Sequence, residues 1–180
     1  MIERGAEWAH GMLQSEHTDV SYGGEGPTEM DAGTAVRTDY VSYYDGYAAN
    51  LSRMAVVGTP SDAQRERYRD VLEIHRALMD DVLGAGVEAT QVWEFVSEQA
   101  SDRGYDSVSG LAGHSTGVWW HQEDPIFRPG NETRLRPGMV VCLEPILEGF
   151  WHLQDQLLIT DDGAERLSDG FDIGELPVIR

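Results

Sequence analysis

The fold is decided by the stretch TAVRTDYVSYYDGYAANLSRMAVV, residues 34–57. Val, Thr and Tyr are frequent in this stretch, and such residues favour extended chain. In its middle stands Asp45-Gly46, a dipeptide typical of a two-residue hairpin turn. The pattern therefore predicts a strand over 34–44, a tight turn, and a returning strand over 47–57.

The register of this hairpin places polar side chains on one face. With that turn, Val41 lies opposite Asn50. Asp39 shares the face of Val41 because side chains alternate along a strand, so Asp39 and Asn50 are diagonal neighbours about 7–8 Å apart. Further along, Glu144 and Gln154 flank a loop, and a symmetric hairpin would place them opposite each other. These side chains either converge on a small ligand or are ordinary polar residues at strand ends.

The rest of the chain predicts an α+β fold in a single domain, residues 1–180. A capping box at Ser61 and Gln64 is followed by apolar residues at helical spacing up to Gly84. The other expected elements are helices over 2–14 and 90–100, strands over 138–143 and 153–160, and a strand or bulged loop over 113–121. Strands on both sides of a helix pair indicate a mixed sheet with helices on one face.

The composition excludes several classes of protein. The 32 Asp and Glu residues outnumber the 13 basic residues, which are all Arg, and the net charge is −19. Phosphate backbones would be repelled, so no nucleic-acid partner is expected. The single cysteine, Cys142, excludes an intramolecular disulfide and a Cys-cluster zinc site. Without a long apolar run or a signal-like N-terminus, we expect a cytoplasmic protein with no membrane partner.

The acidic, lysine-free composition also predicts a halophilic source. The acids are spread along the chain, so their repulsion acts on the whole fold, and salt screens it. We expect the midpoint of thermal unfolding to rise as salt is increased from near zero to the molar range, measured by circular dichroism. Equal midpoints at both ends would contradict this prediction. The alternative explanation is an acidic field that attracts a metal or repels acidic substrates.

Three motifs resemble those of a known family. Residues 113–125, GHSTGVWWHQEDP, are similar to a GHxxG…H..P motif, and residues 135–145, LRPGMVVCLEP, to an L.PGMV…EP segment. Residues 39–53 match the pattern D…GY..D..R except at one position. On these motifs the chain resembles the creatinase/aminopeptidase (M24, pita-bread) superfamily, in its Xaa-Pro aminopeptidase and creatinase-like branch. The resemblance implies the α+β pita-bread fold, a mixed curved sheet with helices on one face.

The resemblance also implies a set of metal-ligand positions. Peptidase members hold two divalent metals through two Asp, one His and two Glu; carried over, these positions are Asp39, Asn50, His114, Glu144 and Gln154. Asn50 and Gln154 depart from the pattern, because a neutral amide does not bridge two dications as a carboxylate does. The other three side chains suit one divalent metal ion, Mn, Fe or Zn. A creatinase-like enzyme would use none.

By this resemblance the chain is expected to be a hydrolase of a C–N bond in a small peptide or amide. Glu144 is the expected base, with His114 or His121 as the acid. Substrate contacts are expected from His121, His152 and Trp120, although His152 read alone is equally an ordinary surface histidine. The competing hypothesis is a catalytically inactive pita-bread binding module or truncated pseudoenzyme.

Two expectations concern partners and chain length. The resemblance implies a small-molecule or peptide substrate and a homodimer. Fewer residues precede the turn-rich segment 21–33 than in the family, which leaves open whether the N-terminus is complete.

Overall fold

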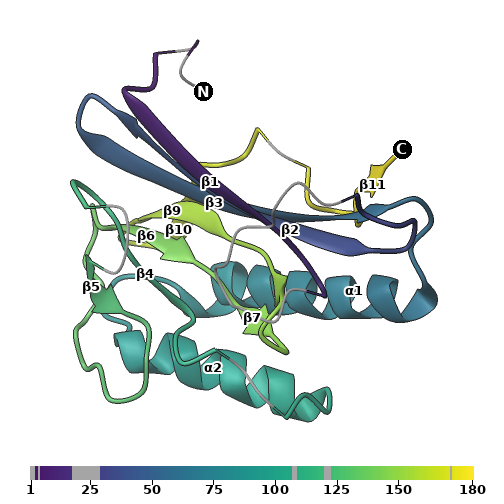
Figure 1. The fold of residues 1–180 in the computed structure, drawn as a ribbon. Helices are drawn as coiled ribbons and strands as arrows, with labels where there is room; N and C mark the ends of the chain where they lie inside the picture. Colours follow the sequence, from purple (N-terminus) through teal and green to yellow (C-terminus); the bar gives the residue numbers. More distant parts are fainter. Residues whose placement is uncertain (1–2, 4, 18–28, 107–108, 120–122, 171) are drawn as a thin grey trace.

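The predicted hairpin is the centre of the fold. The computed structural model describes residues 3, 5–17, 29–106, 109–119, 123–170 and 172–180. Strand β2, Ala35–Tyr44, pairs antiparallel with β3, Tyr47–Val57, and Val41 lies opposite Asn50 as predicted (Figure 1). Both residues of the turn have positive φ, 49° at Asp45 and 77° at Gly46, which is the conformation that favours Asp-Gly in tight hairpins.

The helix predicted over 2–14 is wrong for the described part of that segment. Residues Trp8–Ser15 form strand β1, which pairs antiparallel with β2. Apolar residues about four apart imitate helical spacing here. Pairing with β2 supplies hydrogen-bond partners for the backbone groups of β1 that face it, and such long-range pairing overrides a weak local preference. Strand β1 matters for the site, because it places Gln14 directly opposite Arg37.

The hairpin lies in a four-stranded sheet of order β1-β2-β3-β11, and the other strands form a sheet of five and a sheet of two. Their order is β10-β9-β6-β4-β5 in the five-stranded sheet, and β7 pairs with β8. The bounds are β4 Gly113–Ser115, β5 Glu123–Ile126, β6 Val140–Leu143, β7 Ile146–Leu147, β8 Trp151–His152, β9 Asp155–Ile159 and β10 Ala164–Arg166. Strand β11, Val178–Ile179, runs parallel to β3 and makes the first sheet mixed.

Two helices cover one side of the strands (Figure 1). Helix α1, Asp62–Ala77, begins at the predicted capping box, in which Ser61 and Gln64 each accept from the other's backbone N–H. It runs into a π-helical turn, Leu78–Val82, and helix α2, Ala89–Asp102, follows. The apolar core lies between these helices and the strands and includes residues of both larger sheets.

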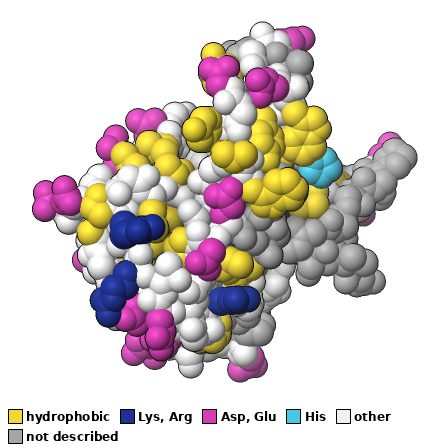
Figure 2. All heavy atoms as spheres, turned by 90° about the vertical axis from the view of Figure 1, so that its left-hand side faces the viewer, with side chains coloured by type: hydrophobic (Ala, Val, Ile, Leu, Met, Phe, Trp, Pro, Cys, Tyr) yellow, Lys and Arg dark blue, Asp and Glu magenta, His cyan; other side chains and the backbone are white. Residues whose placement is uncertain are grey.

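The surface agrees with the even spread of acids along the sequence. Figure 2 shows acidic side chains at separate places on one face of the molecule, with few arginines between them. Within the described ranges, no helix is both long and apolar enough to cross a membrane.

Candidate functional site

A backbone bridge joins the two larger sheets, those of four and five strands. Ser52 of β3 and Gln154, the residue before β9, are bridged antiparallel. Each donates its N–H to the other's carbonyl oxygen, at 3.3 and 3.2 Å. The bridge brings the polar face of the β2–β3 hairpin against the end of the five-stranded sheet.

The Gln154 side chain extends this bridge to Glu144. Ser52 Oγ donates to Gln154 Oε1 at 3.1 Å, and Gln154 Nε2 donates to Glu144 Oε2 at 2.8 Å. Ser52 and Gln154 are fully buried, and Glu144 is 4% exposed. Glu144 and Gln154 therefore lie together, as the symmetric hairpin predicts.

Asp39 and Asn50 lie on the same face of the hairpin as Ser52. Ser52 is directly opposite Asp39, and Asn50 precedes Ser52 by two residues. Burial raises the pKa of Asp39, while the hydrogen bond with Ser52 and the charges of Arg37 and His10 act in the opposite direction. Asn50 is buried, and its Oδ1 has no hydrogen-bond partner within the described part of the chain. A buried amide oxygen of this kind offers a place for a donor from a ligand or water.

Glu144 lies beside a buried histidine. His152 Nε2 is 3.8 Å from Glu144 Oε2, and His152 is 1% exposed, so the surface alternative for this histidine is wrong. Burial, together with the negative charge of Asp39, raises the pKa of Glu144 to about 8, while the charge of Arg37 lowers it. Burial and the charge of Arg37 hold the pKa of His152 well below its usual value. Near neutral pH, His152 is thus uncharged and Glu144 is largely protonated.

His114 reaches the same region from β4. It pairs with Cys142 of β6, two residues before Glu144, so the three side chains share a face. His114 is fully buried, and its Nδ1 lies 2.8 Å from the Ser115 carbonyl oxygen. Because a carbonyl only accepts, Nδ1 carries a proton. Burial raises the pKa of the Cys142 thiol well above its usual value, which agrees with an apolar core cysteine rather than a nucleophile.

The remaining predicted residues, Trp120 and His121, lie outside the described residues, and their predicted roles stay predictions. The structure brings together Asp39, Asn50, Glu144 and Gln154 around Ser52, with His152 beside Glu144 and His114 on the face of Glu144.

The prediction missed Arg37, a buried cation next to this cluster. Arg37 is 3% exposed and lies two residues before Asp39, on the same face of β2. Its Nε donates to Gln14 Oε1 at 2.7 Å, and its Nη1 donates to the Gly149 carbonyl at 3.3 Å. Its guanidinium carbon is 5.8 Å from the centre of the Phe150 ring. The alternation that placed Asp39 on the site face was also the signal that could have found Arg37.

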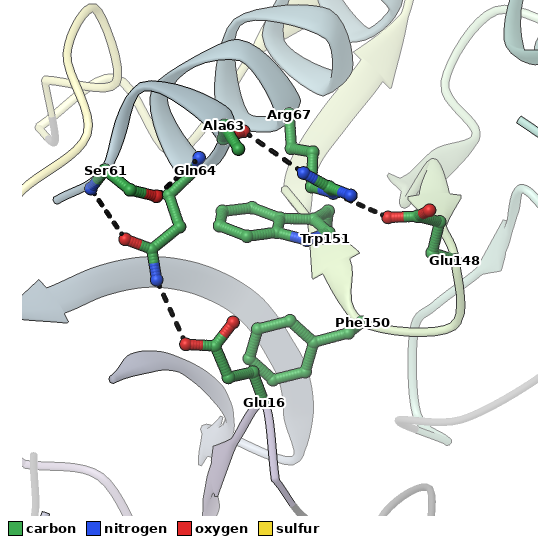
Figure 3. Close-up of a pocket in the computed structure, with 8 residues that line it drawn as sticks. All are labelled: Glu16, Ser61, Ala63, Gln64, Arg67, Glu148, Phe150 and Trp151. Carbon is green, nitrogen blue, oxygen red and sulfur yellow. Dashed lines mark hydrogen bonds and ion pairs between the residues drawn. The ribbon is translucent and has the colours of Figure 1, made fainter. Parts of the chain in front are cut away.

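A cavity of about 410 Å³ lies at the start of α1, and Phe150, which Arg37 contacts, is one of its lining residues. Figure 3 shows Trp151 at its centre, with Gln64 and Glu16 on one side and the Arg67–Glu148 ion pair on the other. Glu16 is held by Gln64 Nε2, which donates to its Oε1 at 3.0 Å. Among the residues of the predicted site that the structure describes, none lines this cavity.

Comparison with known proteins identifies the family. Residues 3–174 match the model of metallopeptidase family M24. The chain belongs to this family. The resemblance drawn from the three motifs is therefore confirmed, and with it the α+β pita-bread fold.

The relatives of this M24 chain are peptidases. A Xaa-Pro dipeptidase of Pyrococcus furiosus is 32% identical over 144 residues, which are 77% of this chain and 41% of the relative. Methionine aminopeptidase A of a Synechocystis species is 29% identical over 138 residues, 74% of this chain and 53% of the relative. The solved prolidase from Pyrococcus furiosus matches with a TM-score of 0.87 and 28% identity, covering 95% of this chain and 52% of that one. The chain spans about half the length of the proteins it matches.

The donor set of this M24 chain does not fit the family's metal pair. Asn50 and Gln154 are uncharged, and Gln154 already uses its amide oxygen for Ser52 and its amide nitrogen for Glu144. Within the part of the chain that the structure describes, no three His, Cys, Asp or Glu side chains are arranged to hold a metal ion. The single-metal alternative through Asp39, His114 and Glu144 stays a prediction.

Proposed function

We propose that this M24 chain hydrolyses a C–N bond in a small peptide or amide, with Glu144 as the group that moves the proton. The observation that carries the proposal is the buried hydrogen-bonded cluster of Ser52, Gln154 and Glu144 in the fold of a peptidase family. The names of the relatives, Xaa-Pro dipeptidase and methionine aminopeptidase, favour a peptide substrate.

Each group in the cluster is assigned one task. Ionised Glu144 takes a proton from a water molecule whose oxygen attacks the carbonyl carbon. When the C–N bond breaks, the leaving nitrogen receives a proton from Nε2 of His114, which enters this step as an imidazolium. The proton that Glu144 took from water then returns to His114 Nε2. Gln154 Nε2 donates to Glu144 Oε2, which fixes the direction of that carboxyl group. Because the uncharged Asn50 and Gln154 do not suit the family's metal pair, no step is assigned to a metal ion.

The test is hydrolysis by the purified chain in high salt. Xaa-Pro dipeptides, peptides with N-terminal Met and small amides are incubated with the chain, and released amino acids are separated by chromatography. We expect several turnovers per chain on at least one substrate, and loss of this turnover in His114→Ala. Turnover that persists in His114→Ala, or none on any substrate, would refute the proposal.

A binding module is the second candidate. It is favoured because the amide oxygen and the amide nitrogen of Gln154 both bond within the cluster, to Ser52 and to Glu144. Such a closed hydrogen-bond network is typical of a structural role. Saturable binding of a dipeptide without its cleavage, measured by calorimetry, would establish this function instead. A homodimer, a cytoplasmic location and a single domain over residues 1–180 stay predictions alongside both candidates.

A further inference from the structure

The cavity at the start of α1 lies outside the cluster around Ser52 and is lined by three segments that are distant in the sequence. These are the residue after β1, the first two turns of α1 and the β7–β8 hairpin (Figure 3). Its volume of about 410 Å³ falls within the range of small-molecule pockets, about 300–1,000 Å³. A ligand held here would contact side chains from all three segments.

Trp151, at the centre of this cavity, offers an indole N–H. The residue is 4% exposed, and none of the described residues accepts a hydrogen bond from its Nε1. Nε1 is also not buried away from solvent, so the N–H opens on the cavity that the ring lines. The indole N–H of a largely buried tryptophan normally has an acceptor, and here the acceptor is left to come from a ligand.

Glu16 offers the matching acceptor for a positive group. The backbone N–H of Ala35 and the side-chain Nε2 of Gln64 both donate to its Oε1, at 2.8 and 3.0 Å. These two bonds fix the carboxylate, while Oε2 accepts no hydrogen bond from the described residues. Figure 3 shows this second oxygen on the side of Phe150 and Trp151. A fixed carboxylate oxygen of this kind suits an ammonium group.

The other lining groups supply an apolar surface and a negative balance of charge. The ring centres of Phe150 and Trp151 are 5.8 Å apart, and their planes meet at 88°, so the two rings form an apolar corner. Arg67 Nε donates to Glu148 Oε2 at 2.7 Å, which leaves Glu16 as the lining carboxylate without a basic partner among the described residues. Two carboxylates and one guanidinium give the lining a net charge of −1, which favours a cation.

We propose that this cavity binds the amino terminus of a small peptide with an apolar first side chain. The ammonium group bonds to Glu16 Oε2, the first carbonyl oxygen accepts from Trp151 Nε1, and the side chain packs against the rings of Phe150 and Trp151. A free amino acid fits less well, because its carboxylate adds negative charge to a lining that is already negative. The site is separate from the candidate hydrolytic site, so the inference stands whether or not the chain hydrolyses a peptide.

The experiment measures the binding of leucinamide, the shortest probe with these groups, by calorimetry. We expect saturable binding to the wild-type chain and affinity about tenfold or more weaker in Glu16→Gln. This variant loses the charge but keeps an oxygen for Ala35 and Gln64. Trp151→Phe keeps a ring and loses the N–H, and should weaken binding about fivefold. The matched control is Glu66→Gln, an exposed carboxylate of α1, which should leave the affinity unchanged.

Two further probes test each end of the ligand. N-acetyl-leucinamide lacks the ammonium group, so it should bind weakly and with the same affinity to the wild-type chain and to Glu16→Gln. Leucine, which has a carboxylate in place of the amide, should bind the wild-type chain more weakly than leucinamide does.

The proposal is overturned if leucinamide shows no saturable binding, or if it binds Glu16→Gln as tightly as the wild-type chain. Binding that is lost in Glu144→Gln and kept in Glu16→Gln would mean that leucinamide occupies the candidate hydrolytic site. That result overturns this proposal and leaves the proposed hydrolysis intact. Conversely, absence of hydrolysis with binding that depends on Glu16 refutes the proposed function alone. Circular dichroism checks each fold, and if Trp151→Phe does not fold, Glu16→Gln and N-acetyl-leucinamide decide.

Discussion

Replacing Glu144 by Gln should lower kcat for peptide or amide hydrolysis by about 10²–10⁴-fold, the range expected when a positioned general base is removed. Gln has nearly the same shape and still accepts a hydrogen bond from Gln154, so the fold should be kept while the proton acceptor is lost. Circular dichroism confirms the fold, and initial rates measure the loss. The matched control is Glu165→Gln, on the exposed face of β10, which should retain full activity. Turnover that survives in Glu144→Gln would remove Glu144 from the mechanism.

The pH dependence of the wild-type chain, compared with that of Glu144→Gln, supplies an independent check. Since the pKa of Glu144 is raised to about 8, the ionised base is formed only as the pH rises, and the rate should increase through pH 8. The raised pKa also means that the folded state binds the proton more tightly than the unfolded state. This contribution to stability is present below pH 4.5 and is lost as the pH rises through about 8. Glu144→Gln cannot lose it, so the variant should gain stability relative to the wild-type chain between pH 6 and pH 9, measured by urea unfolding.

The sequence predicted those parts of the fold in which local pattern and long-range pairing agree. In the β2–β3 hairpin, the turn dipeptide and the β-branched flanks specify the same register, and this register is observed. In residues 8–15 the apolar spacing indicated a helix. These residues form a strand instead, because they pair with β2. Strands β7 and β8 contain two residues each, too few for any alternation to be visible.

The candidate site was predicted to the extent that it follows from strand geometry and family motifs. Asp39, Asn50, Glu144 and Gln154 converge because two hairpins face each other. Ser52 joins these side chains, but no pattern in the sequence marked it as a site residue, because a serine is common in strands. The buried position of His152 depends on the packing of β8 against α1 and β3, which no local pattern contains.

Replacing Asp155 by Asn should lower the free energy of unfolding by about 3 kcal/mol, the lower end of the cost of breaking a buried ion pair. Asp155 Oδ1 lies 2.5 Å from Arg53 Nη2 and 3.4 Å from Arg166 Nε, and Asp155 is fully buried. Its removal takes one buried carboxylate away from two arginine side chains, each about four-fifths buried. The measurement is urea unfolding at pH 7, and the control is Asp162→Asn in an exposed turn.

The pH dependence of this loss distinguishes the ion pairs from simple packing. Burial raises the pKa of Asp155, but the charges of His75 and Arg53 and the hydrogen bonds of Ser168 and Arg53 outweigh it, so the pKa is lowered overall. The stability that Asp155 contributes is therefore present above pH 3.8 and is lost as the pH falls through its lower folded pKa. The wild-type and Asp155→Asn chains should converge in acid, whereas a packing defect would keep the same difference at every pH.

The Asp155 network also explains why the effect should reach the candidate site. Arg53, which Asp155 holds, donates its Nη1 to the backbone carbonyls of Ser52 and Gln154 at 2.8 and 2.7 Å. These are the two residues of the bridge that joins the sheets. Loss of Asp155 removes one of the groups that hold Arg53, and this weakens the bridge from which Gln154 reaches Glu144. We therefore expect a lower rate of hydrolysis in Asp155→Asn even at temperatures where the variant is fully folded, and an unchanged rate would show that the bridge is held without Arg53.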